Sequence, residues 1–215
     1  MNRSAMTKPS PFPLARPARR ALAALSLAGL ALLGACHAKP AADAAGDAPL
    51  AGAAIGGDFT LVDKAGHTVR WADFAGHYRI VYFGYTFCPD ACPTDLNVAM
   101  RGLDRFAKAH PQAADRIRPI FITIDPARDT PAAVGQFAAA FSPRLLGLTG
   151  TPDQVAAAAK AFAVYYARGK DTPGGYLMDH SRIAYLFGPK GEAIDMLPVD
   201  KGPDAVAQDL ARWVK

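Results

Sequence analysis

Largely apolar runs alternate with stretches of helical periodicity through residues 58–215. Residues 79–83 and 118–124 are rich in β-branched and aromatic side chains, which is typical of strands buried on both faces. Residues 94–109 instead carry apolar side chains three and four positions apart, which predicts an amphipathic helix. The same rules predict the remaining elements: strands at 59–62, 67–71, 145–148, 182–187 and 192–197, helices at 131–141, 152–167 and from Pro203 to the C-terminus, and a polar, glycine-rich loop at 168–178.

The order of these elements predicts the fold class. A hairpin is followed by strand, helix, strand, helix, short strand, helix, hairpin and helix. That order is typical of an α/β, thioredoxin-like sandwich, related to peroxiredoxins, with an added N-terminal hairpin and an inserted strand–helix pair. Residues 58–215 are long enough to form one domain with its own core.

The N-terminus differs from the rest of the chain in charge and composition. Residues 1–20 contain five basic residues and no acidic one; without them the 24 basic residues fall to 19, equal to the 19 acidic residues. The formal net charge of +5 therefore belongs to the N-terminus, and the balanced remainder gives no reason to expect a nucleic-acid partner. Residues 21–35 are Ala, Leu, Gly and one Ser, a run shorter than the roughly 20 residues of a membrane span.

This arrangement predicts an export signal. A basic segment followed by a short apolar core is typical of a secretory signal peptide, so we interpret residues 1–35 as one. The core ends in Leu33-Gly34-Ala35-Cys36, which resembles a bacterial lipobox, in which the cysteine becomes the lipidated first residue. Residues 36–57 are rich in Ala, Gly, Asp and Pro without an apolar period, which predicts a flexible tether. We therefore expect a lipid-anchored domain, residues 58–215, in the cell envelope.

The strongest chemical signal is the motif Phe87-Cys88-Pro89-Asp90-Ala91-Cys92-Pro93. It follows the predicted strand 79–83 and enters the predicted helix, so both cysteines lie at a helix N-terminus. Unpaired N–H groups and the helix dipole stabilise thiolates there, so we expect both thiols to ionise more easily than a free cysteine. With Cys36 lipidated, these two are the remaining thiols of an exported domain, where an unprotected pair tends to oxidise.

The spacing of Cys88 and Cys92 separates two kinds of chemistry. Residues four apart on a regular helix have Cβ atoms about 5–6 Å apart on one face. A disulfide needs a Cβ separation of about 3.5–4.5 Å, so a bridge requires the first helical turn to deform. A soft metal ion between the sulfurs requires less distortion, and thiolates select Cu(I), zinc or iron–sulfur clusters. The spacing predicts a redox pair or a soft-metal site, and favours the metal.

Two further residues are expected near the cysteines. Asp125 follows the predicted strand 118–124 and, like Cys88, lies beyond the carboxyl end of a central strand, where open α/β sheets place their sites. His180 precedes the strand predicted at 182–187. In thioredoxin-like folds the loop before that strand faces the cysteine loop, so His180 is a candidate third metal ligand.

Four blocks of sequence together resemble the Sco/SenC family of copper chaperones for cytochrome c oxidase assembly. The blocks are Phe87-Cys88-Pro89-Asp90-Ala91-Cys92-Pro93, Ile122-Thr123-Ile124-Asp125-Pro126-Ala127-Arg128-Asp129-Thr130, Leu148-Thr149-Gly150-Thr151 and Asp179-His180-Ser181. The resemblance spans about residues 58–215. It implies a thioredoxin-like fold, copper bound by Cys88, Cys92 and His180, and a supporting role for Asp125 in metal transfer. Many family members are anchored by an uncleaved transmembrane helix, whereas this chain looks lipidated.

A copper metallochaperone is therefore the leading hypothesis. Two thiolates and one imidazole suit Cu(I) in a trigonal site, and the same set with an added oxygen suits Cu(II). By resemblance, the acceptor is the dinuclear copper centre of cytochrome c oxidase subunit II, and a thiol reductant or an upstream copper donor is a second partner. Such a protein binds and transfers an ion and is not an enzyme. The expected location is the periplasm, at the inner membrane.

The main alternative is a thiol–disulfide oxidoreductase that keeps the cysteines of a copper-protein acceptor reduced. The fold and a redox disulfide between Cys88 and Cys92 permit this function, but the spacing departs from the Cys-x-x-Cys of thioredoxins, and His180 has no evident task in it. A peroxidase is less well supported, because Tyr85 stands where a threonine is expected three residues before the cysteine. A structural zinc site would need a fourth ligand, and none is evident.

Overall fold

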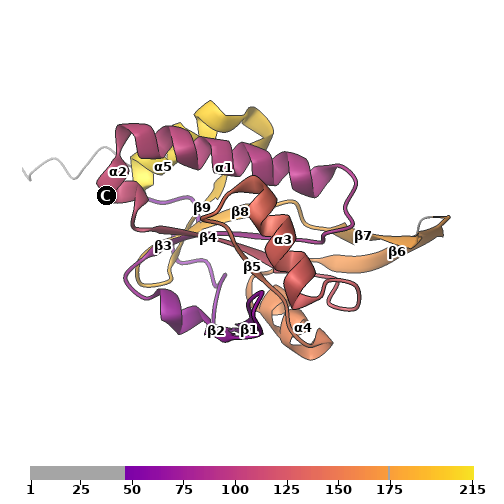
Figure 1. The fold of residues 1–215 in the computed structure, drawn as a ribbon. Coiled ribbons are helices and arrows are strands. Elements are labelled where there is room, and N and C mark those ends of the chain that lie inside the picture. The colour runs from indigo at the N-terminus through magenta and orange to yellow at the C-terminus, as the bar shows by residue number, and fades with distance from the viewer. Residues whose placement is uncertain (1–46, 174) are drawn as a thin grey trace, which may run out of the picture. The chain divides into compact units, whose positions relative to one another are not determined.

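The computed structural model describes residues 47–173 and 175–215, and it is built around a five-stranded mixed sheet (Figure 1). The strands lie in the order β5-β4-β3-β8-β9. Their bounds are Tyr78–Gly84 for β3, Ile117–Thr123 for β4, Leu146–Leu148 for β5, Ala184–Phe187 for β8 and Ala193–Leu197 for β9. Strands β3, β4 and β5 run parallel, whereas β8 and β9 are antiparallel to their neighbours. Every residue of the central strand β3 is buried, Arg79 included, as the apolar run that follows Arg79 predicts.

Helices and a small hairpin cover the two faces of this sheet. Helix α1 (Ala91–Ala109) and helix α5 (Pro203–Trp213) lie side by side over one face (Figure 1). They approach closely at Gly102, where a Cβ atom would come within 2.5 Å of Val206. Helix α4 (Pro152–Ala161) and the hairpin of β1 (Thr60–Val62) and β2 (Thr68–Arg70) lie on the other side. The remaining elements are the helices α2 (Pro111–Ala114) and α3 (Pro131–Phe141) and the 3₁₀ turns η1 (Trp71–Phe74) and η2 (Val199–Lys201).

An aromatic cluster fastens the hairpin and α4 to the sheet. The Trp71 ring meets Phe162 and Phe187 edge-on, with both centroid distances 5.2 Å. Phe83 of β3 packs on Phe162 at 5.4 Å, and Phe59 completes the group at 5.7 Å from Trp71. Buried aromatic rings in such tilted and edge-on pairs add to the stabilisation from apolar burial. This packing supports the sheet from the side opposite α1.

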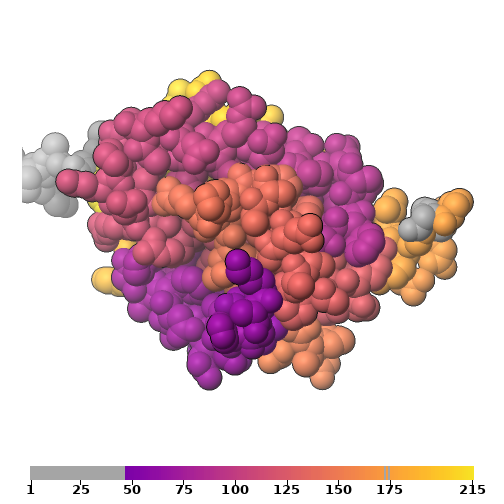
Figure 2. Space-filling model, viewed as in Figure 1, coloured from indigo at the N-terminus to yellow at the C-terminus, as the bar shows by residue number. Residues whose placement is uncertain are grey.

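The segment between α4 and β8 differs from its prediction. Residues 168–178 were expected to form a loop, but β6 (Tyr166–Thr172) and β7 (Gly175–His180) pair as an antiparallel hairpin that projects from the body of the molecule (Figures 1 and 2). Side chains of β7 alternate between exposed and half-buried. The glycines and charged residues of this segment made the period of two hard to recognise in the sequence. Helix α4 ends at Ala161, not near residue 167, because Ala163 adopts a left-handed conformation with φ of 53°.

Part of the segment predicted to be a tether contacts the domain. Leu50 donates a backbone hydrogen bond to Ile194, and Gly56 donates one to Ala161. Ala48, Leu50 and Ile55 pack against the core. Residues 1–46, including the predicted signal peptide 1–35, the lipidation site Cys36 and the first half of the tether, lie outside the described residues, and the domain boundaries remain predictions. Within the described part of the chain, no helix combines the length and the hydropathy that crossing a membrane requires.

Candidate metal centre

The residues that precede Cys88 are held by hydrogen bonds at the carboxyl ends of the central strands. The Asp129 carboxylate, buried after β4, accepts hydrogen bonds from the Thr86 backbone N–H, the Thr86 hydroxyl and the Thr123 hydroxyl. Hydrogen bonds to an ionised acceptor are stronger than those between neutral groups. Asp129 therefore fixes the loop between β3 and α1 relative to β4, and with it the position of Cys88.

The two sulfurs lie at the N-terminus of α1, as the sequence predicts. Cys92 is completely buried and Cys88 is half-buried, and both thiols are free. The Cys92 backbone N–H donates to the Cys88 sulfur at 3.3 Å, so one unpaired donor of the helix terminus is directed at that sulfur. Gly84, the last residue of β3, leaves room for the second sulfur, because a Cβ atom there would lie 2.9 Å from Cys92 Sγ.

His180 is the last residue of β7 and faces Cys92. Its Nδ1 lies 2.9 Å from the Ser181 carbonyl oxygen, which can only accept, so Nδ1 carries the proton and donates it. In the neutral ring Nε2 then has a free lone pair, and Nε2 lies 3.3 Å from Cys92 Sγ. The rings of Tyr82 and Tyr85 meet the imidazole edge-on, with centroid distances of 6.3 and 6.0 Å. The histidine thus has a defined tautomer and orientation for metal binding.

Cys88, Cys92 and His180 form one cluster of donor atoms. The two sulfurs and one imidazole nitrogen all lie within 4.8 Å of one another. Because a metal–thiolate bond is about 2.3 Å long, a single ion fits among atoms at this separation with small adjustments. Two sulfurs and one nitrogen suit soft metals such as Cu(I), and not hard ions such as Mg²⁺ or Ca²⁺. The structure therefore brings together the three residues that the sequence singled out.

Burial changes the protonation of two of these groups. Desolvation raises the pKa of the Cys92 thiol well above its ordinary value, and the neighbouring Cys88 sulfur raises it further. The expectation that both cysteines ionise easily is therefore wrong for Cys92 in the metal-free protein, because loss of solvation outweighs the helix terminus. Desolvation also lowers the pKa of His180. The metal-free site accordingly pairs a neutral Cys92 thiol with a neutral imidazole.

Asp125 lies outside the donor cluster found among the described residues. Its buried carboxylate accepts hydrogen bonds from the Arg128 Nε–H and from the Tyr176 hydroxyl, the latter at 2.8 Å. Since Tyr176 belongs to β7, Asp125 joins the loop after β4 to the strand that ends in His180. The supporting role predicted for Asp125 in metal transfer stays a prediction, and this link through Tyr176 is a physical route for it.

Sequence reasoning also missed Asp95, a further buried carboxylate beside the site. Asp95 follows Cys92 by three residues on α1 and accepts hydrogen bonds from Tyr82 and Arg182. The signal was present, because residues three apart share a helix face, and an aspartate beside Cys92 on the buried face requires a partner. Which residue provides that partner depends on chain segments far apart in sequence.

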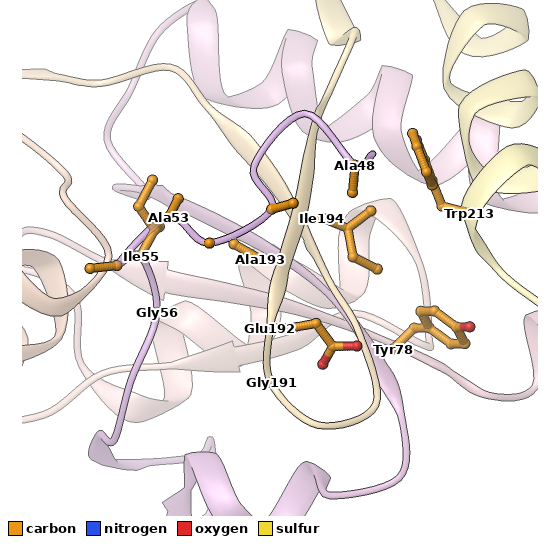
Figure 3. Close-up of a pocket in the computed structure, with 13 residues that line it drawn as sticks. Ala48, Ala53, Ile55, Gly56, Tyr78, Gly191, Glu192, Ala193, Ile194 and Trp213 are labelled. Carbon is orange, nitrogen blue, oxygen red and sulfur yellow. The ribbon is translucent and has the colours of Figure 1, made fainter. Parts of the chain in front are cut away.

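A pocket of about 690 Å³ lies elsewhere in the molecule (Figure 3). Segment 48–56 forms one side, and Ile194 of β9, Tyr78 and Trp213 contribute to the others. None of Cys88, Cys92 and His180 lines it. The pocket is therefore separate from the donor cluster.

Comparison with known proteins adds independent evidence. The family model described as SCO1/SenC matches residues 47–215. The human protein SCO1 homolog, mitochondrial, is 37% identical over 162 residues, which are 75% of this chain and 53% of that protein. Protein SenC of Rhodobacter capsulatus is 39% identical over 160 residues, covering 74% of this chain and 71% of that protein. The chain thus spans about half the length of the human relative.

Solved structures share the fold. The copper-bound structure of ScoI from Bradyrhizobium japonicum has a TM-score of 0.67 and 36% identity, and the match covers 75% of this chain and all of that chain. The copper-bound structure of ScoI from Arabidopsis thaliana has a TM-score of 0.70 and 32% identity, covering 74% of this chain and 97% of that one. The predicted thioredoxin-like α/β fold class is confirmed. The Cys–Cys–His cluster, the fold and these relatives agree, and the chain belongs to the SCO1/SenC family.

Proposed function

We propose that this protein is a copper metallochaperone that holds one copper ion through Cys88, Cys92 and His180 and passes it to an acceptor protein. The observation that carries the proposal is the cluster of two sulfurs and one imidazole nitrogen within 4.8 Å of one another. Related proteins with 36% and 32% identity have been solved with copper bound. Thiolate ligands favour Cu(I), and nitrogen with an added oxygen ligand accommodates Cu(II).

The three ligands differ in accessibility, which suits transfer. Cys92 is completely buried, whereas Cys88 and His180 are half-buried. An acceptor ligand approaches from the exposed side, so exchange begins at Cys88 or His180 and ends at Cys92. Each step replaces one metal–ligand bond with another, and no electron is transferred. The Cys92 thiol, protonated in the metal-free protein, loses its proton when copper binds and regains it when copper leaves.

The acceptor in this proposal is the dinuclear copper centre of subunit II of cytochrome c oxidase. The support is the four-block sequence resemblance to chaperones of oxidase assembly, together with membership of the SCO1/SenC family. Asp125 assists transfer by holding the His180 strand through Tyr176. A lipid on Cys36 anchors the domain on the periplasmic side of the inner membrane, and an upstream copper donor or a thiol reductant restores the loaded form.

A thiol–disulfide oxidoreductase is the second candidate, favoured by the two free sulfurs lying within 4.8 Å of each other. In this reaction the Cys88 thiolate attacks an acceptor disulfide and forms a mixed disulfide, and one acceptor sulfur leaves as a thiolate. Cys92 then attacks Cys88, giving a Cys88–Cys92 disulfide and a second acceptor thiolate. The acceptor gains two electrons, which an external thiol reductant must return to the protein.

Anaerobic titration with Cu(I) against a competing chelator tests the first proposal. Every sample is the full chain carrying Cys36→Ser, so that Cys88 and Cys92 are the only thiols. Wild type is expected to hold one copper, and Cys88→Ser, Cys92→Ser and His180→Ala each to weaken binding. His67→Ala is the matched control, because His67 is highly exposed and pairs with Asp63. Absence of tight copper binding, or binding indifferent to His180, refutes the proposal and favours the reductase.

A further inference from the structure

A buried carboxylate of the cysteine helix holds Tyr82, whose ring packs against His180, and Arg182, which follows His180 by two residues. Asp95 of α1 is only 2% exposed and accepts three hydrogen bonds. The Tyr82 hydroxyl donates at 2.9 Å, and the Arg182 guanidinium donates through Nε at 3.1 Å and Nη2 at 2.7 Å. The two-pronged Arg182 contact is the geometry that restricts a guanidinium–carboxylate pair most strongly. Within the described chain, none of these three residues belongs to the donor cluster.

The position of Arg182 connects this network to the histidine ligand. Arg182 follows His180 by two residues, in the short link between β7 and β8. Its guanidinium is anchored to Asp95, which lies less than one helical turn from Cys92. The link that carries His180 is therefore attached to the same turn of α1 that carries the buried sulfur. Only two peptide units separate Arg182 from His180, so a displacement of Arg182 also moves the imidazole.

Tyr82 completes the arrangement from the sheet. Its hydroxyl is held by Asp95, and its ring meets the His180 ring edge-on at a centroid distance of 6.3 Å. The aspartate thus fixes both the link that follows the histidine and an aromatic surface against which the histidine packs. Among the described residues, the His180 ring has hydrogen-bond contacts with Ser181 and Cys92, and the Cys92 contact alone links the ring directly to α1.

We propose that Asp95 is a positioning residue that, through Arg182 and Tyr82, sets the distance between the His180 imidazole and the Cys92 sulfur. The inference rests on the proposed function only for the identity of the ion. Its consequence depends on the oxidation state of copper. Thiolates alone are good ligands for Cu(I), whereas Cu(II) favours nitrogen and oxygen. Loss of the network should therefore weaken Cu(II) binding far more than Cu(I) binding.

The first test needs no metal. Nitrogen-15 NMR of the histidine rings in the reduced, metal-free full chain with Cys36→Ser reports the tautomer of His180 and the contact at Nε2. Wild type is expected to show one species protonated at Nδ1. Arg182→Gln and Asp95→Asn are expected to shift the His180 signals and to populate both tautomers, and Arg182→Lys, which keeps the charge, is expected to restore them in part.

The second test measures copper. Mutation of a residue that orients a metal ligand typically lowers metal affinity by about 10–100-fold. Arg182→Gln should therefore weaken Cu(II) binding by roughly that factor and Cu(I) binding much less. In a His180→Ala background the same substitution should have no further effect, which a double-mutant cycle detects. Arg105→Gln is the matched control, because Arg105 also joins α1 to an aspartate, Asp204 of α5, on a part of the helix that holds no ligand.

The outcomes separate the inference from the proposed function. The inference is overturned if both Arg182 variants have the His180 signals and the Cu(II) affinity of wild type. It is also overturned if Arg182→Gln weakens copper binding as much in the His180→Ala background as in wild type, because Arg182 then has only a structural role. A wild-type protein that binds no copper refutes the proposed function, yet the NMR experiment still decides the inference. Arg182 is 56% exposed, so its variants keep the test decisive even where Asp95→Asn does not fold.

Discussion

The metal centre has a cysteine side and a histidine side, and they are held in different ways. The cysteine side, residues 85–90 and the first turn of α1, is attached to the central sheet through backbone connections and through Asp129, which accepts three hydrogen bonds. The histidine side comprises the β6–β7 hairpin, which is a separate two-stranded sheet, and residues 181–183, which lead into β8. Side-chain links to Asp95 and Asp125 attach it to the rest of the molecule.

This difference indicates where the site opens first. Displacing a cysteine requires rearrangement of a buried helix terminus, whereas displacing the histidine requires the loss of a few side-chain hydrogen bonds. Elements with few buried contacts open at lower free energy than core elements. We therefore expect the two sulfurs to stay preorganised while the hairpin moves, so that a ligand set of two thiolates and a removable imidazole can retain an ion and then release it.

The largest expected effect is on Cu(I) binding by the cysteine side. Cys92→Ser should abolish retention of Cu(I) at chelator concentrations where wild type stays loaded, because a hydroxyl is a poor ligand for a soft ion. His180→Ala should only weaken it. Competition titration of both variants tests whether Cys92→Ser loses more Cu(I) affinity than His180→Ala. Equal losses in the two variants would remove the distinction between the sides.

A smaller effect is expected from crowding the buried sulfur. Gly84→Ala places a Cβ atom 2.9 Å from Cys92 Sγ, and overpacking of this kind costs about 1–3 kcal/mol of unfolding free energy. Copper affinity should fall as well, because the sulfur must shift. Gly102→Ala is the matched control: its Cβ meets Val206 at 2.5 Å between α1 and α5, so it should lose stability and keep copper affinity. Denaturant unfolding and copper titration of both variants make the comparison.

A still smaller effect is expected at the hairpin. Tyr176→Phe removes the hydrogen bond to the Asp125 carboxylate, which keeps its Arg128 partner. Amide hydrogen exchange should accelerate in β6 and β7 and stay unchanged in β3, because the link supports the histidine side alone. Tyr165→Phe serves as the control, since Tyr165 is highly exposed. Faster exchange in β3 would show that the two sides are not independently held.

The smallest effect concerns how the stability of the metal-free protein depends on pH. The lowered pKa of His180 means that the unfolded chain binds a proton below about pH 6.5 that the folded one does not, so stability should fall as pH drops through that value. The raised pKa of Cys92 means that the unfolded chain loses a proton above about pH 9 that the folded one keeps, so stability should also fall there. Urea unfolding gives the free energy of unfolding at each pH. Its dependence on pH should be flatter on the acid side in His180→Ala and flatter on the alkaline side in Cys92→Ser. A wild-type curve without these two limbs would contradict the burial of both groups.

Much of the molecule was evident from the sequence, because the information is local. The apolar runs of β3 and β4 and the period of α1 predicted their elements to within a few residues. The Cys-x-x-x-Cys motif and the Asp-His-Ser block identified Cys88, Cys92 and His180 through the short segments that contain them. The order of the elements then predicted that His180 meets the cysteines, since in thioredoxin-like folds the loop before that strand faces the cysteine loop.

The tertiary structure decided what depends on contacts between distant segments. The hairpin at residues 166–180 escaped prediction because glycines and charges concealed its alternation, and pairing between its strands provides the stability that local propensity lacks. Arg182 reaches Asp95 across 87 positions in sequence, a partnership that periodicity does not reveal. The pKa of Cys92 likewise follows from complete burial, because desolvation is a property of everything packed around the sulfur and not of the helix that carries it.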